Sequence, residues 1–311
     1  MNLSPALRNS FITARQNLLR DNLPFICEEK LREGIEEELD EIIELSDLEK
    51  CQKGADFFDL PDMKAEHYQE RLINIDSERA VLLGVRFRGL RIDECYVNTW
   101  ANFEIKSEIE IEELKQVARR EFACFHPKWI SLSFAPDIDW APMKYHIDLV
   151  TLVAEVSQLQ KREVSDDEVY LELADNLDFY GQYSDEYKKF HLEKPHLKKE
   201  VTKETLADLE ACAQDSLLYK VMKDNEMIGL MAARREAKYG ENGVCIQEKF
   251  LFSGYRGLGL SDVFQTQFFQ NLAADQEPIV WGTILHHNHG SLKSALRTGR
   301  RAVEADYFFD I

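Results

Sequence analysis

The segment Phe252–Ser261, which reads FSGYRGLGLS, constrains the fold more than any other part of the chain. It follows a run of strand-forming residues, Val244–Phe252, and precedes a helical pattern from Gly257 to Leu272. Glycines in such a turn let the backbone approach a ligand, and the amides of the first helical turn then face it with partial positive charge. The segment therefore predicts an anion site suited to a pyrophosphate, with Arg256 as an added charge.

Two familiar phosphate loops do not fit this segment. It lacks the third glycine of a dinucleotide-binding turn, and the strands around it read as antiparallel hairpins. No Gly-Lys-Ser or Gly-Lys-Thr follows, which excludes a nucleoside triphosphate loop. A glycine turn with a purely structural role remains the alternative to an anion site.

The elements around the turn predict two domains with mixed α and β structure. The polar stretch Lys161–Asp167 is the expected boundary, which gives domains of residues 1–165 and 166–311. Thr202 is the expected N-cap of a helix over Lys203–Gln214, without a full capping box. Tyr145–Leu159 is apolar enough for a buried helix or a strand, and its periodicity does not decide between them. Strands are expected at Ala80–Gly89, Cys95–Phe103, Trp129–Phe134, Glu168–Ala174, Ser216–Met222, Met227–Arg234, Val244–Phe252, Pro278–Leu285 and Ala302–Phe309, and further helices at Ile109–Phe125, Asp185–Leu192 and Gly290–Arg297.

The turn Arg256-x-x-Gly259-x-Ser261 and the later Asn288-x-x-Ser291, with Gly299 eleven residues after the asparagine, resemble motifs of the GNAT superfamily of acyl-CoA-dependent N-acetyltransferases. The resemblance covers about residues 168–311. It implies an α+β fold with a mixed sheet in the C-terminal domain, and acetyl-CoA as cofactor. The N-terminal domain could then be a degenerate GNAT-like copy. The residues implied to bind CoA are Leu251, Phe252, Arg256, Gly257, Leu258, Gly259, Leu260, Ser261, Asn288 and Ser291.

The same resemblance also implies where the catalytic residues lie. It implies that the strands Val244–Phe252 and Pro278–Leu285 splay apart to hold the pantetheine arm. Glu248 is the nearest carboxylate for a general base, and His286 is an imidazole that could take the same role. Ala295 stands where the family has the tyrosine that protonates the leaving thiolate, so Tyr307 is considered as a replacement acid.

The chain carries 38 Lys and Arg against 57 Asp and Glu, a formal net charge of -19. This balance argues against a nucleic-acid partner and favours a cationic acceptor. No apolar run is long enough to span a membrane. The six scattered cysteines form no CxxC pair, and no secretory signal is evident, so we expect reduced thiols and a cytoplasmic location. The histidines of residues 286–289 are not expected to bind a metal, because neighbouring residues of an extended chain point apart.

The sequence thus predicts an N-acetyltransferase that moves an acetyl group from acetyl-CoA to a primary amine of a small molecule or protein. Ala295 supports a second interpretation, a catalytically silent CoA-binding sensor or interaction module. A third, aminoacyl transfer from charged tRNA, would need a basic groove that the charge balance disfavours.

Overall fold

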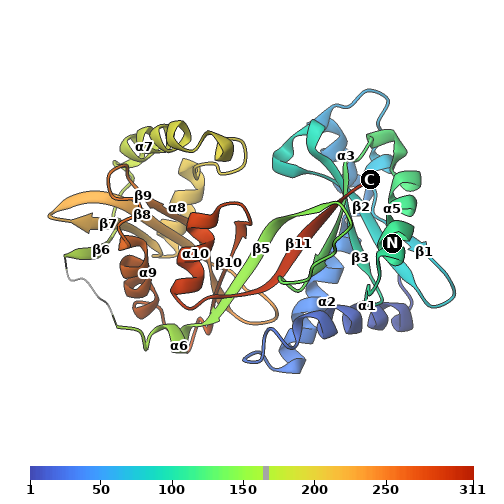
Figure 1. Cartoon of the computed structure of the whole chain (residues 1–311), viewed down its shortest axis with the longest axis horizontal. Helices are drawn as coiled ribbons and strands as arrows, with labels where there is room; N and C mark the ends of the chain where they lie inside the picture. Colours follow the sequence, from blue (N-terminus) through green and yellow to red (C-terminus); the bar gives the residue numbers. More distant parts are fainter. Residues whose placement is uncertain (164–167) are drawn as a thin grey trace. The chain divides into compact units, whose positions relative to one another are not determined.

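The computed structural model describes residues 1–163 and 168–311, which form two compact units. Unit 1 comprises Met1–Val150 and Val303–Ile311, and unit 2 comprises Thr151–Ala302. The expected boundary between residues 165 and 166 lies outside the described residues. The division also differs from the predicted domains at the C-terminus, because the last strand pairs within unit 1 (Figure 1).

Unit 1 begins with helices and continues with a five-stranded run of sheet. Its strands follow the order β1-β2-β3-β4-β11. Neighbours are antiparallel except β3 and β4, which are parallel and are joined through α5. The elements are α1 (Pro5–Leu19), α2 (Glu28–Glu44), α3 (Leu48–Phe58), α4 (Ala65–Tyr68), β1 (Arg71–Asn74), β2 (Ala80–Phe87), β3 (Cys95–Ala101), α5 (Glu108–Glu121), β4 (Trp129–Phe134), β5 (Tyr145–Glu155) and β11 (Arg301–Asp310).

Unit 2 has the strand order β10-β9-β8-β7-β6, and it also contains one parallel pair, β9 and β10, joined through α9. The three strands before that crossover are antiparallel in both units. The two units therefore share a core topology of three antiparallel strands, a helix and a parallel strand. The elements are α6 (Val156–Leu159), β6 (Val169–Leu173), α7 (Tyr180–Glu193), α8 (Leu206–Gln214), β7 (Leu218–Lys223), β8 (Glu226–Arg235), β9 (Gly243–Leu251), α9 (Leu260–Gln270), β10 (Ile279–Leu285) and α10 (His289–Arg297).

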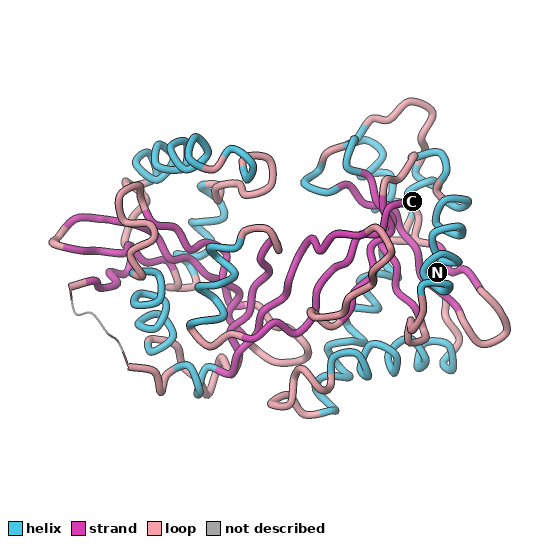
Figure 2. The backbone as a smooth tube through the Cα atoms, viewed as in Figure 1, coloured by secondary structure: helices cyan, strands magenta, loops and turns pink. Residues whose placement is uncertain are grey.

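The sheet of unit 2 carries helices on both faces, as the backbone trace shows (Figure 2). One apolar cluster packs α6 and α9 on the sheet through residues such as Leu159 and Phe264. The other packs α7 and α8 through Tyr183 and Leu209. Successive residues of β9 point to alternate faces, so this strand presents side chains to both clusters.

Most strands lie within two or three residues of their expected bounds. Other elements differ from the prediction. The helix expected from Lys203 begins at Leu206, because Thr205 is its N-cap and forms a capping box with Asp208. The undecided stretch from Tyr145 is strand β5, followed by the short helix α6. Helix α7 begins at Tyr180, five residues before the expected Asp185, and strand β1 and helices α3 and α4 had no expected counterpart.

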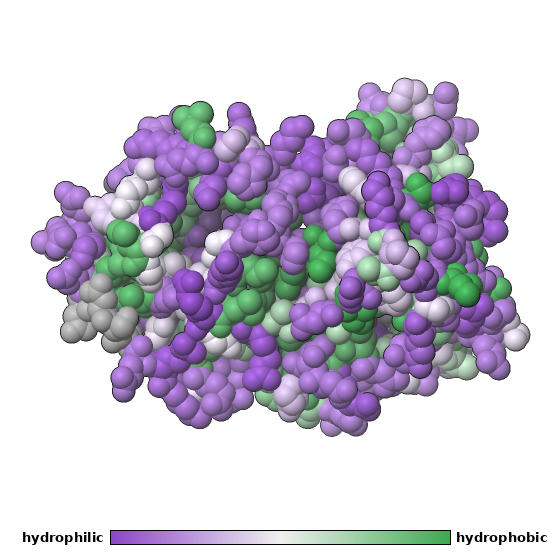
Figure 3. Space-filling view, viewed as in Figure 1, coloured by the Kyte–Doolittle hydropathy of each residue, from purple (hydrophilic) through white to green (hydrophobic). Residues whose placement is uncertain are grey.

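The surface is predominantly hydrophilic on the face in Figure 3, in keeping with a chain whose charged residues make up 31%. Across residues 1–163 and 168–311, no helix combines the length and apolar character that crossing a bilayer requires.

Candidate functional site

Strands β9 and β10 separate soon after they meet. Their parallel pairing runs from Ile279 with Gly243 to Trp281 with Cys245. Both strands continue beyond that point, β9 to Leu251 and β10 to Leu285, without further paired positions among the described residues. The splay that the resemblance implied is therefore present, and it leaves one edge of β9 with unpaired backbone groups.

A β-bulge lies in β9 just beyond the last pair. Ala232 of β8 faces Glu248, whereas the next residue, Ala233, faces Ile246, so Gln247 is an extra residue in β9. A bulged residue is left out of the ladder, and the strand bends there. The bulge thus places Gln247 at the point where the two strands part.

The backbone hydrogen bonds of β9 identify which residues face the open edge. The Phe252 amide donates to the Ile228 carbonyl at 2.8 Å, so its amide is used within the sheet. Because direction alternates along a strand, Leu251 and Lys249 direct their backbone groups away from β8, toward the splay. Of the two residues predicted to pair with pantetheine, Leu251 lies on the open edge and Phe252 does not.

The glycine turn has the backbone conformation that only glycine adopts without strain. Gly257 and Gly259 have φ of 78° and 81°, and Gly259 is the N-cap of α9. A Cβ built on either glycine meets no atom within 4 Å. No side chain caps this helix, so its first amides are not covered by one. Leu258 is 64% exposed, whereas Leu260 is buried in the core.

The Arg256 side chain contacts other parts of the protein, although it was predicted to add charge to an anion site. Its Nε donates to the Leu251 carbonyl at 2.7 Å, and its Nη1 pairs with Glu193 at 2.6 Å. The guanidinium also lies over the rings of Phe190 and Phe250. Its charge is thus compensated locally, which leaves the backbone of the turn as the group expected to bind an anion.

Glu248 is buried on the face of β9 that packs against α7. Its carboxylate accepts a hydrogen bond from the Tyr183 hydroxyl at 2.5 Å and another from the Lys249 amide at 2.9 Å. Burial raises the pKa of Glu248 to about 7, against the lowering effect of the Tyr183 hydrogen bond. Such a carboxyl exchanges protons near neutrality, as a general base must.

Sequence analysis missed the partners of Glu248. Tyr183 lies on α7, and its oxygen accepts a hydrogen bond from the Glu204 amide at 3.0 Å. Burial, with Asp208 nearby, raises the pKa of Glu204 to about 7 as well. These residues lie 65 and 44 positions before Glu248, and no local motif links them to it.

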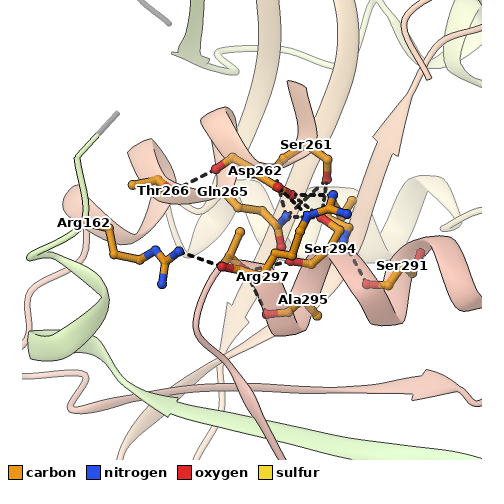
Figure 4. Close-up of polar contacts among 11 residues, drawn as sticks. Arg162, Ser261, Asp262, Gln265, Thr266, Ser291, Ser294, Ala295 and Arg297 are labelled. Atoms are coloured by element: carbon orange, nitrogen blue, oxygen red, sulfur yellow. Dashed lines mark hydrogen bonds and ion pairs between the residues drawn. The ribbon is translucent and has the colours of Figure 1, made fainter. Parts of the chain in front are cut away.

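Ser261 belongs to a polar network that joins the first turn of α9 to α10 (Figure 4). Its hydroxyl lies 3.0 Å from that of Ser294, which donates to Asp262 at 2.9 Å. Arg297 donates to the same Asp262 carboxylate at 2.7 Å. Gln265 donates to both serines. The Ser261 hydroxyl thus helps to hold the helix start in place, while the Ser261 backbone amide belongs to the first turn of α9.

Asn288 and Ser291 lie at the start of α10. The Asn288 side chain is the N-cap and accepts from the Ser291 amide at 3.5 Å. The Ser291 carbonyl accepts from Lys249 at 3.4 Å, which brings this turn of α10 next to β9. The two residues predicted to bind CoA therefore shape the helix end beside the splay.

The other two predicted catalytic residues, His286 and Tyr307, lie in different parts of the structure. His286 is half-buried in the turn between β10 and α10, where burial lowers its pKa and so favours the neutral imidazole. Tyr307 is fully buried in unit 1, and its hydroxyl donates to the Ala135 and Pro136 carbonyls. The proposal that Tyr307 replaces the missing acid is therefore wrong, because aromatic packing and these bonds fix it in the core.

The corresponding helix start in unit 1 is closed. Helix α5 begins with a capping box in which Glu110 accepts from the Lys106 and Ser107 amides at 2.8 and 3.0 Å. The Ser107 hydroxyl in turn accepts from the Glu110 amide at 3.3 Å, so a first-turn amide of α5 is covered by a side chain, which is not the case in α9. No glycine occurs between β3 and α5. In the described part of the chain, no group of three or more His, Cys, Asp or Glu side chains is arranged to hold a metal ion.

No protein-family model matches the chain, and no curated protein matches it either. Solved structures do resemble it. A GCN5-related N-acetyltransferase from Sphaerobacter thermophilus has 12% sequence identity and a TM-score of 0.51, over 86% of this chain and 90% of that one. A GNAT-family acetyltransferase from Colwellia psychrerythraea has 12% identity and a TM-score of 0.47, over 86% and 97%. A tandem GNAT protein from the clavulanic acid biosynthesis pathway has 8% identity and a TM-score of 0.42, over 75% and 78%.

The topology agrees with the first of these likenesses. Three antiparallel strands, a glycine turn, a helix and a splayed parallel strand follow one another in unit 2. Unit 1 repeats the strand and helix order without the glycine turn. The chain therefore has the fold of the GNAT superfamily of N-acetyltransferases.

Proposed function

We propose that the chain is an acyltransferase that moves an acetyl group from acetyl-CoA to a primary amine, and that unit 2 carries the site. The observation that carries the proposal is the splay of β9 from β10 beside an uncapped helix start. A strand edge with unpaired amides can bind an extended amide-containing arm, and the helix start can bind a pyrophosphate.

The residues present fit CoA. The space in front of Gly257 and Gly259 is open, and a Cβ at either position would begin to fill it. The Leu251 amide lies on the open edge of β9, whereas the Leu251 carbonyl already accepts from Arg256 Nε. When bound, acetyl-CoA supplies an activated acetyl group as a thioester.

Glu248 is our candidate for the general base. Amine attack requires loss of a proton from nitrogen, and a carboxyl with a pKa of about 7 takes that proton near neutral pH. Tyr183 keeps the carboxylate in one orientation through its hydroxyl. The Gln247 backbone amide at the bulge is a candidate donor to the negative charge that develops on the carbonyl oxygen.

The acceptor is expected to be cationic. The Tyr183 hydroxyl donates to the Glu248 carboxylate and accepts from the Glu204 amide, and repulsion by the Glu204 carboxylate contributes to the raised pKa of Glu248. A positively charged amine relieves such repulsion when it binds. The net charge of -19 also favours cations at long range.

A silent CoA-binding sensor remains the second candidate, because Ala295 replaces the tyrosine of the family pattern and is fully buried. One experiment separates the two functions. Acetyl-CoA is added to the full chain with a panel of primary amines, and thermal stabilisation and free thiol are both measured. Stabilisation with amine-dependent thiol release supports the acetyltransferase, whereas stabilisation without release supports the sensor. The absence of both effects contradicts the CoA site itself.

A further inference from the structure

Acetyl transfer needs a proton for the departing thiolate, and the usual donor is missing. Ala295 has no ionisable group, and Tyr307 lies in the core of unit 1. A different donor would have to lie on the open edge of β9 or on the facing turn of α10.

Lys249 meets the positional requirement. It follows Glu248 on β9, beyond the last residue that pairs with β10, and points to the opposite face of the sheet. Its Nζ lies 3.4 Å from the Ser291 carbonyl, one helical turn before Ala295 on α10. The amine therefore lies beside the same helix that would carry the tyrosine in the family pattern.

The surroundings of Lys249 are unusual for a lysine. The charged groups that act on it electrostatically are Arg300, which follows α10, Arg297 on α10 and Asp262 on α9, together with its strand neighbour Glu248 on the other face of the sheet. Asp262 is already paired with Arg297 and Ser294. No salt bridge involves Lys249 among the described residues. The amine is thus half-buried next to cations and has no carboxylate bound to it.

We propose that Lys249 is the general acid that gives its proton to the departing thiolate. The inference rests on the proposed acetyltransferase function. The amine nitrogen forms a bond to the acetyl carbon, and the carbon–sulfur bond breaks. The ammonium form of the acceptor first releases one proton to solvent through Glu248; after attack, the second nitrogen proton goes to the Glu248 carboxylate, and the Lys249 proton goes to the sulfur. Solvent then carries one proton from Glu248 to Lys249, so that both groups return to their starting states.

The titration of Lys249 agrees with this role. Burial, and then Arg300, lower the pKa of Lys249 to about 7, so its ammonium gives up a proton more readily than that of an exposed lysine. Glu248 on the other face has a similar pKa. The strand thus places a base and an acid of matched strength at neighbouring positions, one on each face of the sheet.

The test compares Lys249→Met and Lys249→Arg with the wild type and with Lys293→Met, which removes an exposed lysine of α10. Methionine keeps the length of the side chain and loses the proton, whereas arginine keeps the charge and does not release its proton near pH 7. We measure kcat and KM for acetyl-CoA from pH 6 to 10. The Lys249 amine is titrated separately by NMR on lysine-labelled protein, with Lys249→Met to assign the signal.

Both Lys249 variants should lose about a hundredfold or more in kcat, with KM changed by less than about threefold. The fall of kcat at high pH should disappear with the lysine, and Lys293→Met should behave as the wild type. An NMR pKa of Lys249 above about 9, close to that of an ordinary lysine, would overturn the proposal. Unchanged kcat in Lys249→Met, or a change confined to KM, would do the same. If the wild type binds CoA but transfers no acetyl group, the proposed function fails and this inference fails with it.

Discussion

The glycine turn of unit 2 allows a test of the CoA site that separates binding from folding. Gly259 has a φ of 81° at the N-cap of α9, and a Cβ there meets no atom within 4 Å. The Cβ of valine in Gly259→Val therefore meets open space, and the expected cost of the substitution is the strained backbone, about 1–3 kcal/mol. For a protein of this size, each kcal/mol lowers the Tm by about 2–4 °C. The variant should remain folded.

The same substitution should remove CoA binding. The branched side chain would lie between the amides of the helix start and the oxygens of a pyrophosphate. Acetyl-CoA at a hundred times its Kd stabilises the wild type by about 2.7 kcal/mol. This corresponds to a rise in Tm of about 5–10 °C. Thermal melts with and without acetyl-CoA should show this rise for the wild type and none for Gly259→Val.

Gly254→Val is the matched control. Gly254 has a φ of 89° and open space at its Cβ, so valine there carries the same backbone strain five residues before the helix start. It should lose a similar amount of stability and keep the response to acetyl-CoA. A full ligand response in Gly259→Val would refute the anion site. Loss of the response in both variants would show that strain in the loop, not the helix start, controls binding.

Three further predictions concern the site. Glu248→Gln should lower kcat about a hundredfold or more and abolish the rise of kcat through pH 7. Steady-state rates measured against pH test this, and an unchanged pH profile would exclude Glu248 as the base. Tyr183→Phe removes a hydrogen bond that lowers the pKa of Glu248, so the rise should move to higher pH, and a shift to lower pH would contradict the assignment. Calorimetric titration should give one CoA per chain, because the capping box of Ser107 and Glu110 closes the helix start of unit 1; a stoichiometry near two would contradict this interpretation of the capping box.

Much of the fold of unit 2 could be predicted from the sequence because its signals are local. The strand before the glycine turn, the helix after it and the hairpin at Lys223–Glu226 each depend on a few neighbouring residues. The splay followed from the resemblance, which the fold confirms. The pairing partner of the last strand, β11, was harder to predict, because β11 pairs with β4 and joins residues more than 170 positions apart. No periodicity distinguishes that partner from a strand of unit 2.

The site shows the same division between local and distant signals. The glycines of the turn could be found from the sequence because positive φ selects glycine. Glu248 could be named from the sequence as the nearest carboxylate, but its burial could not, because Tyr183 and Tyr187 cover it from α7. Arg256 shows the opposite case. The motif predicted the position of Arg256 in the sequence, but the direction of its guanidinium depends on Glu193 and on the rings of Phe190 and Phe250. Side-chain partners of this kind depend on packing, which spacing does not encode.

The two titrating residues of β9 should also influence stability, with opposite dependence on pH. The pKa of Glu248 is raised from 4.5 to about 7, so the native state favours its neutral form, and that contribution is present below pH 4.5 and is lost as the pH rises through 7. Its upper limit is about 3 kcal/mol. The pKa of Lys249 is lowered from 10.5 to about 7, so its contribution is present above pH 10.5 and is lost as the pH falls through 7. In urea titrations, Glu248→Gln should therefore gain stability over the wild type as the pH rises from 4.5 to 7, and Lys249→Met should gain as it falls from 10.5 to 7. Gains that do not depend on pH, or that have the reverse slopes, would show that ordinary packing, and not buried ionisation, accounts for these residues.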